Sequence, residues 1–577
     1  MEKSKIARIL LVLLVLWFCC MPIFWRMDLS NPTAQYYDAF SMAPYAMLHL
    51  AVFYLIALLL LYFNGFSMWL VLLLALYFPA IQVINFPFLT ARDVFLHAGP
   101  ARFALVQGEI SGTPTVESWS GSFILHTVFS AISGEDLINA NYVLYFALIV
   151  TFAAFAYCIA EKLAKKGYQL AGYCTILLLT LFFSHFSDFI LYSRSNLAFT
   201  LFILFIFAFT FFDGRRGFLL QVIIASAVFV VHPFQSLAIV AYVVSYSVLT
   251  RITRSRHSRV PLALFSISAF SAWFVFNAPA LLDAALSRLS QPLPAVYTSS
   301  ILTTLSSRQQ LPWWGSVFRD FFKYSFISLL IFASVSLIPF LLQRRQVSDK
   351  KTMINASLLS LLPMAAIMFL SLVLLPDWGI WRSTVFASFP IALALLVSID
   401  WIDAQKHKIS LLRKKSLRRS VPAVFLLFIM ILSAMVMVLK CEGNLYYGDL
   451  NHPSELSGLS FVFTNNLDSS ITFLSWRTAL YSSYYNYNSS HAIRYLWITE
   501  LNAISDDSSE VLYRQNQLIN QSRLIVRGMR DSFTLGLNER NANESLRENV
   551  DQGLMQPKFS SIYSNGLYIV YYQTVPP

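Results

Sequence analysis

Residues 66–88, FSMWLVLLLALYFPAIQVINFPF, form an almost uncharged apolar run, and residues 90–110, TARDVFLHAGPARFALVQGEI, follow it with a cluster of charges. A helix of about 20 apolar residues is long enough to cross the hydrocarbon core of a membrane. The second stretch places Arg92, Asp93 and His97 close to the point where the chain leaves that core. Ionisable side chains at a membrane boundary are costly, so they act either as anchors or as parts of a functional site.

The composition of the whole chain agrees with a membrane protein. Of the 577 residues, 57% are hydrophobic and only 12% are charged, whereas soluble domains carry about 25% charged residues. The net charge of +12 does not indicate a nucleic-acid partner, because Lys and Arg fall in short clusters between the apolar runs. The five cysteines show no paired spacing, so no disulfide framework or zinc site is expected.

The apolar runs predict an α-helical polytopic membrane protein with about thirteen transmembrane helices. The predicted spans are 7–25, 44–63, 66–84, 139–160, 168–186, 196–212, 217–231, 234–250, 260–277, 322–343, 353–375, 383–400 and 421–440. Residues 122–133 are apolar but too few to cross alone. With a cytoplasmic N-terminus and an odd number of spans, every strongly basic loop falls on the cytoplasmic side. The sequence therefore predicts a multi-pass protein of the cell membrane in this orientation.

This topology divides the chain into a transmembrane domain, 1–440, and an extracytoplasmic segment, 441–577. The transmembrane domain carries two large outer loops, 85–121 and 278–321. The C-terminal segment is large enough for one globular domain. Its runs ITFLSW, RLIVRG and LYIVYYQTV favour strands, DDSSEVLYRQNQLINQS favours a helix, and Asn565-Gly566 is typical of a β-hairpin turn. We expect a small α/β domain.

The charged stretch after residue 88 predicts two short helices. Asp93 lies where a loop turns into a helix, and His97 is one turn further on the same face. Pro100 suits the first turn of a second short helix that would end at Gly108. That helix would lie at the membrane interface, with Arg102 near the headgroups. In the alternative interpretation, Asp93 only caps its helix and pairs with the preceding arginine.

Further polar residues are expected at the outer ends of the spans. His232, beside the helix-breaking Pro233, is either a ligand of a donor phosphate or an ordinary interfacial histidine. Arg382, between two tryptophans, either binds a lipid phosphate or extends from an aromatic belt to the headgroups. Arg194 lies on the same side.

The spacing of acidic and histidine residues is compatible with one cofactor, a divalent Mg or Mn ion. His185 and Asp188 have helical i, i+3 spacing on the predicted outer side, and with Asp93 they would form an oxygen-rich site. The alternative is that Asp188 caps a loop and His185 is an interfacial side chain.

Three short motifs carry a family resemblance. ARDVFLHA (91–98), ESWSGSFILH (117–126) and the C-terminal YSNGLYIVYY (563–572) resemble, in this order along the chain, the GT-C superfamily of membrane glycosyltransferases. That superfamily includes oligosaccharyltransferases, protein mannosyltransferases and archaeal relatives that use polyprenyl-phosphate sugars. The resemblance implies an enzyme of the cell envelope that transfers a sugar, with inversion, from a polyprenyl-phosphate-linked donor to a protein or glycan acceptor on the outer face.

The resemblance also implies roles for individual residues. Asp93 matches the acidic residue of the first outer loop, which contacts the acceptor and serves as catalytic base. The residues expected around the substrate are Arg92, His97, Arg102, Arg194, His232 and Arg382. The oligosaccharyltransferase signature Trp-Trp-Asp-Tyr-Gly is absent from the sequence, which argues against transfer of a preassembled glycan to asparagine.

Two other function classes share this profile. A polysaccharide or lipid transporter would carry polar residues deep within its spans, whereas here they gather at the outer ends. A polysaccharide polymerase of the O-antigen type would depend on arginines in its large outer loops and would not need Asp93.

Overall fold

The structure, a computed structural model, describes residues 3–24, 48–49, 51–57, 59–60, 68–85, 90–110, 118–163, 192–252 and 259–279, the single positions 283 and 359, and the short strands of the C-terminal segment. Apart from position 359, five of the predicted spans lie outside these residues, namely 168–186, 322–343, 353–375, 383–400 and 421–440. The total of thirteen spans therefore stays a prediction.

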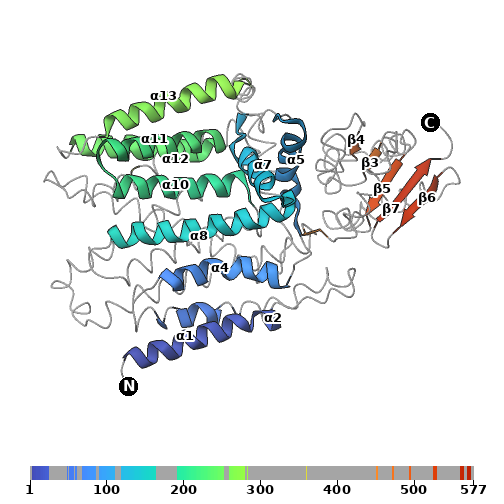
Figure 1. Ribbon diagram of the computed structural model, residues 1–577, viewed down its shortest axis with the longest axis horizontal. Helices are drawn as coiled ribbons and strands as arrows, with labels where there is room; N and C mark the ends of the chain where they lie inside the picture. The colour runs from blue at the N-terminus through green and yellow to red at the C-terminus, as the bar shows by residue number, and fades with distance from the viewer. Residues whose placement is uncertain are drawn as a thin grey trace, which may run out of the picture.

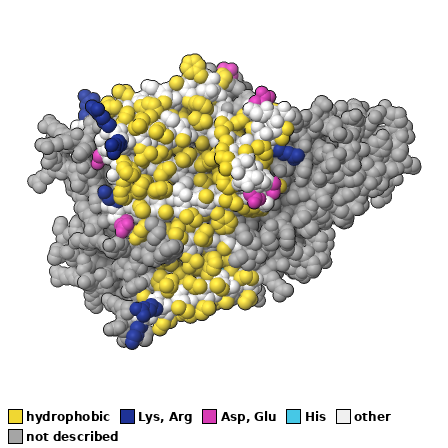
Figure 2. Space-filling view, in the orientation of Figure 1, with side chains coloured by type: hydrophobic (Ala, Val, Ile, Leu, Met, Phe, Trp, Pro, Cys, Tyr) yellow, Lys and Arg dark blue, Asp and Glu magenta, His cyan; other side chains and the backbone are white. Residues whose placement is uncertain are grey.

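Long helices stack side by side in a bundle (Figure 1). They are α1 (Lys3–Cys19), continued by the short α2 (Met21–Phe24), then α4 (Met68–Asn85), α8 (Leu137–Leu163), α10 (Arg194–Phe211), α11 (Gly214–Val231), α12 (Pro233–Ile252) and α13 (Val260–Asn277). In the described part of the chain, six helices are long and apolar enough to cross a membrane: Lys5–Ile23, α8, α10, α11, α12 and α13. Hydrophobic side chains cover the middle of the bundle and Lys and Arg lie at its edges (Figure 2). These features support a multi-pass membrane protein.

Two shorter helices, α5 (Arg92–Gln107) and α7 (Gly121–Ser133), lie together at one end of the bundle (Figure 1). We call this the α5/α7 end. The apolar segment 122–133, which the sequence showed to be too short to cross alone, lies within α7. The starts of α8 and α10 lie at the same end, because Leu137 and Arg194 contact His126 and Phe123 of α7. The start of α12 lies there too, since Gln235 bonds to Ser195 of α10.

The charged stretch forms one helix, not the two that were expected. Pro100 lies inside α5 and is buried. A proline in a helix disturbs the preceding residue through a clash with its Cβ, and here that residue is Gly99, which has none. The helix therefore continues through Pro100 with the loss of one backbone hydrogen bond. It ends as predicted at Gly108, whose φ of 77° is in the left-handed region.

Pro233 separates α11 from α12, as the sequence predicted. The intervening His232 is extended, with φ −161° and ψ 131°. A hydrophobic cluster beside this break joins α8, α10 and α11 through Tyr145, Leu197, Val231 and their neighbours. Because lipid tails are as apolar as these side chains, such packing stabilises the bundle mainly through close van der Waals contact.

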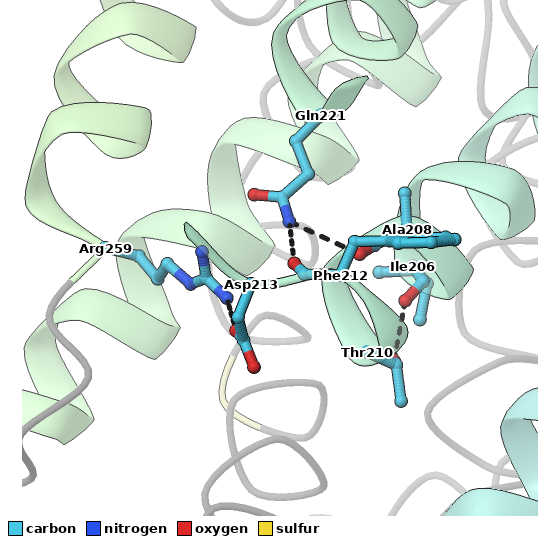
Figure 3. Close-up of polar contacts among 7 residues, drawn as sticks. All are labelled: Ile206, Ala208, Thr210, Phe212, Asp213, Gln221 and Arg259. Atoms are coloured by element: carbon cyan, nitrogen blue, oxygen red, sulfur yellow. Dashed lines mark hydrogen bonds and ion pairs between the residues drawn. The ribbon is translucent and has the colours of Figure 1, made fainter. Parts of the chain in front are cut away.

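The opposite end of the bundle contains the tight turn between α10 and α11 (Figure 3). A Cβ on Gly217 would lie 2.4 Å from the Phe212 carbonyl oxygen, so only glycine permits this approach. The buried Gln221 donates from Nε2 to the carbonyl oxygens of Ala208 and Phe212, at 3.3 and 3.1 Å. Arg259, which precedes α13, donates to the Asp213 carboxylate. The turn is therefore fixed by both backbone proximity and side-chain hydrogen bonds.

The C-terminal segment contains a five-stranded sheet in the order β4-β3-β5-β7-β6. Its strands are β3 (Ile471–Phe473), β4 (Ile493–Tyr495), β5 (Leu524–Gly528), β6 (Phe559–Ser564) and β7 (Tyr568–Gln573). β3 is parallel to β4 and β5, whereas β7 is antiparallel to β5 and β6. Strands occur at all three predicted places, and β6 and β7 pair across Asn565-Gly566. The predicted helix 506–522 lies outside the described residues, so the α/β class of this segment remains a prediction.

One further strand pair joins the two parts of the chain. β1 (Thr90–Ala91) pairs antiparallel with β2 (Leu450–Asn451), with Thr90 opposite Asn451 and Ala91 opposite Leu450. Because α5 begins at the next residue, the first outer loop and the start of the C-terminal segment are in direct backbone contact.

Candidate functional site

The predicted catalytic region lies on α5. Arg92 and Asp93 are its first two residues, and His97 follows one turn later. A carboxylate in this position is favoured by the partial positive charge of the helix N-terminus. The side-chain positions of these three residues lie outside what the structure describes. Arg102, on the same helix, is half-buried.

The second half of α5 is packed against α7 and α8. Ala98 and Ala101 are fully buried and form a small cluster with Leu137 at the start of α8. The Thr127 hydroxyl of α7 donates to the Ala101 carbonyl oxygen at 2.9 Å. The bundle thus fixes the position of this helix from Ala98 onward.

The two ring nitrogens of His232 have different partners. Nδ1 accepts the backbone N–H of Phe234 at 3.3 Å, and Nε2 lies 3.2 Å from the Ser195 hydroxyl oxygen. A neutral imidazole that accepts at Nδ1 carries its proton on Nε2. His232 is therefore assigned as a donor toward Ser195, at the junction of α10 and α12.

Arg194 lies beside that junction as the first residue of α10. The preceding Ser193 caps the helix, since its hydroxyl accepts the Asn196 N–H at 3.2 Å. The half-buried guanidinium carbon of Arg194 lies 5.6 Å from the centre of the Phe123 ring on α7. The structure thus brings the segments of Arg194 and His232 together at one end of the bundle.

Gln235, in the first turn of α12, makes a further hydrogen bond between α12 and α10. Its Nε2 donates to the Ser195 carbonyl oxygen at 3.4 Å. Its Oε1 is buried and has no hydrogen-bond partner in the part of the chain that the structure describes. Sequence reasoning missed both Gln235 and Ser195. A glutamine three residues after His232 in the helix-starting motif HPFQS was the signal that could have revealed the first.

The start of α7 contacts the same place. A Cβ on Gly121 would lie 2.9 Å from Cγ2 of Val231, the residue before His232. The Ser122 carbonyl oxygen accepts the hydroxyl of Tyr192 at 2.9 Å. Among the described residues, the buried side chains of Trp119 and Ser122 each have a polar atom without a hydrogen-bond partner. The start of α7 therefore packs closely against the end of α11, at the residue before His232.

His126, one turn further along α7, has a structural role. It is fully buried, and its Nε2 donates to the Leu137 carbonyl oxygen at 2.7 Å. Burial lowers the pKa of His126 to about 4, although the hydrogen bond to Leu137 opposes this shift. The ring is therefore neutral near neutral pH. Burial likewise raises the pKa of Tyr192, so its hydroxyl stays protonated as the donor to Ser122.

Three helices begin at this place: α7 at Gly121, α10 at Arg194 and α12 at Pro233. The helix dipole adds a partial positive charge at each of these N-termini, although the Asn196 and Phe234 N–H groups already donate to Ser193 and His232. Together with Arg194 and the Nε2 donor of His232, this arrangement favours an anion. We call Arg194, Ser195, His232 and Gln235 the anion cluster.

Other predicted residues are not tested by this geometry. Arg382, His185 and Asp188 lie outside the described residues, as does the Asp93 side chain. Within the described residues, no group of three or more His, Cys, Asp or Glu could hold a metal ion. The Mg or Mn site at Asp93, His185 and Asp188 remains a prediction.

Comparisons with known proteins complete this description. No family model matches the chain, and no curated protein matches it either. Among solved structures, the chain is similar to the oligosaccharyltransferase of Archaeoglobus fulgidus in the apo form, at 10% identity and a TM-score of 0.49, over 82% of this chain and 72% of that one. A complex of that protein with Zn and sulfate gives 10% identity and 0.48, over 88% and 73%.

ArnT from Cupriavidus metallidurans bound to undecaprenyl phosphate gives 10% identity and a TM-score of 0.39, over 83% of this chain and 93% of that one. These proteins belong to the kind of membrane glycosyltransferase that the sequence motifs also resemble. At TM-scores this low, the likeness carries no argument about the activity of this chain.

Proposed function

We propose that this chain is a membrane glycosyltransferase that moves a sugar from a polyprenyl-phosphate-linked donor to a protein or glycan acceptor on the outer face of the membrane. The anion cluster is the observation that carries the proposal. Its members come from the start of α10 and from the break between α11 and α12, and hydrogen bonds of Ser195 with His232 and Gln235 join the two places.

The anion cluster would hold the phosphate of the donor. When a sugar leaves its carrier, negative charge collects on the phosphate oxygens. Such a leaving group needs little protonation, but it needs fixed hydrogen-bond donors and positive charge around it. Arg194 and the dipoles of α10 and α12 would supply positive charge, and the Nε2–H of His232 would donate to a phosphate oxygen in place of the Ser195 hydroxyl.

Asp93 would serve as the catalytic base. It would accept the proton of the acceptor hydroxyl while the oxygen forms a bond to the anomeric carbon and the bond to the phosphate breaks, with inversion at that carbon. Arg92, His97 and Arg102 on the same helix would contact the substrates. In this proposal the N-terminus is cytoplasmic, and α5, α7 and residues 441–577 lie outside.

Asp93→Asn tests the assignment of the base. We expect sugar transfer to fall about 100-fold or more, because general base catalysis typically contributes about 10²–10⁴-fold. Transfer would be measured in membranes from radiolabelled polyprenyl-phosphate monosaccharides, with protein level and membrane insertion checked in parallel.

Glu109→Gln is the matched control, since Glu109 is an exposed acid just beyond the end of the same helix. This control should retain normal transfer. Full activity of Asp93→Asn would contradict the assignment of the base. Movement of the donor across the membrane with its sugar still attached would instead indicate a transporter.

A further inference from the structure

The β1–β2 pair connects the candidate catalytic helix to a distant part of the chain. Ala91, paired with Leu450, is followed directly by Arg92 and Asp93, the first two residues of α5. In Figure 1, α5 lies on the side of the bundle that faces the C-terminal sheet. The backbone of the first outer loop is thus bonded to the start of the C-terminal segment.

The two halves of α5 are held by different partners. From Ala98 onward, α7 and α8 fix the helix through the buried alanines and the hydrogen bond of Thr127 to Ala101. The first turn follows β1, whose direction is set by its ladder with β2. Only Arg92 separates that ladder from Asp93, so little backbone freedom remains between them.

We propose that the C-terminal segment positions the first turn of α5 through the β1–β2 pair. This inference rests on the proposed function, because Asp93 lies in that turn. Thr90, Ala91, Leu450 and Asn451 are then positioning residues that act through their backbone groups. The C-terminal segment is part of the catalytic arrangement in this view, although it contributes no reacting group.

A cysteine pair tests the register of the strands. Directly opposed residues in an antiparallel pair have Cα atoms about 4.5–5.5 Å apart, within the range of about 4.4–6.8 Å that disulfides span. Thr90→Cys with Asn451→Cys, in the full-length protein in membranes, should form a disulfide under mild oxidation. After protease cleavage between the two positions, the fragments should stay joined on a non-reducing gel.

Ala91→Cys with Asn451→Cys is the offset control, because neighbouring residues of a strand point to opposite faces. Each single-cysteine variant measures the background from the native cysteines. A yield for the opposed pair no higher than for the offset pair or the single variants would overturn the proposal.

Leu450→Pro tests the positioning role, because the fixed φ of proline, about −65°, departs from the extended conformation of a two-residue antiparallel strand. Reaction with a membrane-impermeant maleimide would be followed at Asp93→Cys and at Val106→Cys, which marks the other end of α5. Adding Leu450→Pro should change the labelling rate at position 93 about fivefold or more and leave the rate at 106 unchanged. Leu450→Ala keeps the backbone ladder and should leave both rates unchanged.

An unchanged rate at position 93, or an equal change at both positions, would overturn the proposal. In the otherwise native chain, Leu450→Pro should lower kcat about tenfold with an unchanged KM for the lipid-linked donor, since misplacing a reacting group affects the chemical step. If native membranes show no sugar transfer but labelling at 93 still responds, the proposed function fails and the coupling stands.

Discussion

At the residue scale, the ring nitrogen of His232 that carries the proton decides its role. His232 either activates Ser195 as a nucleophile or donates a hydrogen bond to a phosphate. A histidine that activates a serine must present an unprotonated nitrogen to the hydroxyl. Here Nδ1 is occupied by the Phe234 N–H, so Nε2 carries the proton and faces Ser195. This arrangement suits donation to a phosphate oxygen and does not suit activation of Ser195 as a nucleophile.

His232→Ala should therefore weaken donor binding. A hydrogen bond to a charged group contributes about 1.5–3 kcal/mol, which corresponds to a rise in KM for the polyprenyl-phosphate sugar of roughly 10- to 100-fold. Ser195→Ala removes the hydroxyl but keeps the histidine donor, and it should change KM by less than about threefold. Initial rates at varied donor concentration would measure both, and a larger effect of Ser195→Ala would favour the nucleophile.

His126 should give the stability a dependence on pH. Its ordinary pKa is 6.5 and its pKa in the folded protein is about 4, so the unfolded chain binds a proton more readily. The stabilisation is complete above pH 6.5 and is lost as the pH falls toward 4. His126→Phe should be less stable than the native chain at pH 7.5, because the Leu137 carbonyl oxygen loses its donor. Its melting temperature should, however, fall less than that of the native chain between pH 7.5 and 5.

Thermal unfolding in detergent at the two pH values would measure this difference. Equal losses in His126→Phe and the native chain would show that His126 does not titrate in the expected way.

The candidate site was only partly predictable from the sequence. Arg194 and His232 stood out because they are charged or titratable groups at span ends on the predicted outer side, away from the basic cytoplasmic loops. Ser195 did not, because its role depends on the meeting of α10 with α12, and for Gln235 only its spacing of three residues from His232 gave a signal. Gly121 lies within the motif ESWSGSFILH, but its close approach to Val231 follows from the packing of α7 against α11.

At the element scale, the turn between α10 and α11 shows which polar contact matters more. Asp213 is 76% exposed at its ion pair with Arg259, and such surface pairs contribute about 0–1 kcal/mol. Gln221 is fully buried. Its Nε2 donates to the carbonyl oxygen of Ala208, in the last turn of α10, and to that of Phe212, just after the helix. Leaving a buried acceptor without its donor costs about 1–3 kcal/mol.

Gln221→Leu should therefore lower the melting temperature in detergent clearly more than Asp213→Asn does. The leucine is similar in size and apolar, so the comparison isolates the lost hydrogen bonds. An Asp213→Asn variant that is the less stable of the two would show that the ion pair, not the buried amide, holds the turn.

The elements themselves were predicted to different degrees. Apolar runs and Pro233 were enough to place α8, α10, α11, α12 and α13 within a few residues. The expected break at Pro100 was wrong, because Gly99 removes the clash that normally ends a helix before proline. The β1–β2 pair could not be predicted, since a ladder of two residues leaves no pattern of side chains in the sequence.

At the scale of the whole molecule, charge is distributed unevenly between the two ends of the bundle. The end opposite α5 and α7 has Arg215 and Arg216 at the start of α11, Arg251 near the end of α12, and Arg259. At the α5/α7 end, by contrast, Arg102 and Arg194 are half-buried, and the acids Glu109, Glu135 and Asp136 are exposed. Since cytoplasmic loops carry an excess of Lys and Arg, this asymmetry favours an outer location for α5 and α7.

Cysteine labelling on intact cells tests this orientation. Val106→Cys, at a residue that is 65% exposed at the end of α5, should react with a membrane-impermeant maleimide added outside. Arg216→Cys, at the opposite end, should react only after the cells are permeabilised, and the native chain measures the background from its own cysteines. The reverse pattern would place α5 on the cytoplasmic side. An outer acceptor could not then reach Asp93, whereas the His126 and Gln221 predictions, which concern packing alone, would be unaffected.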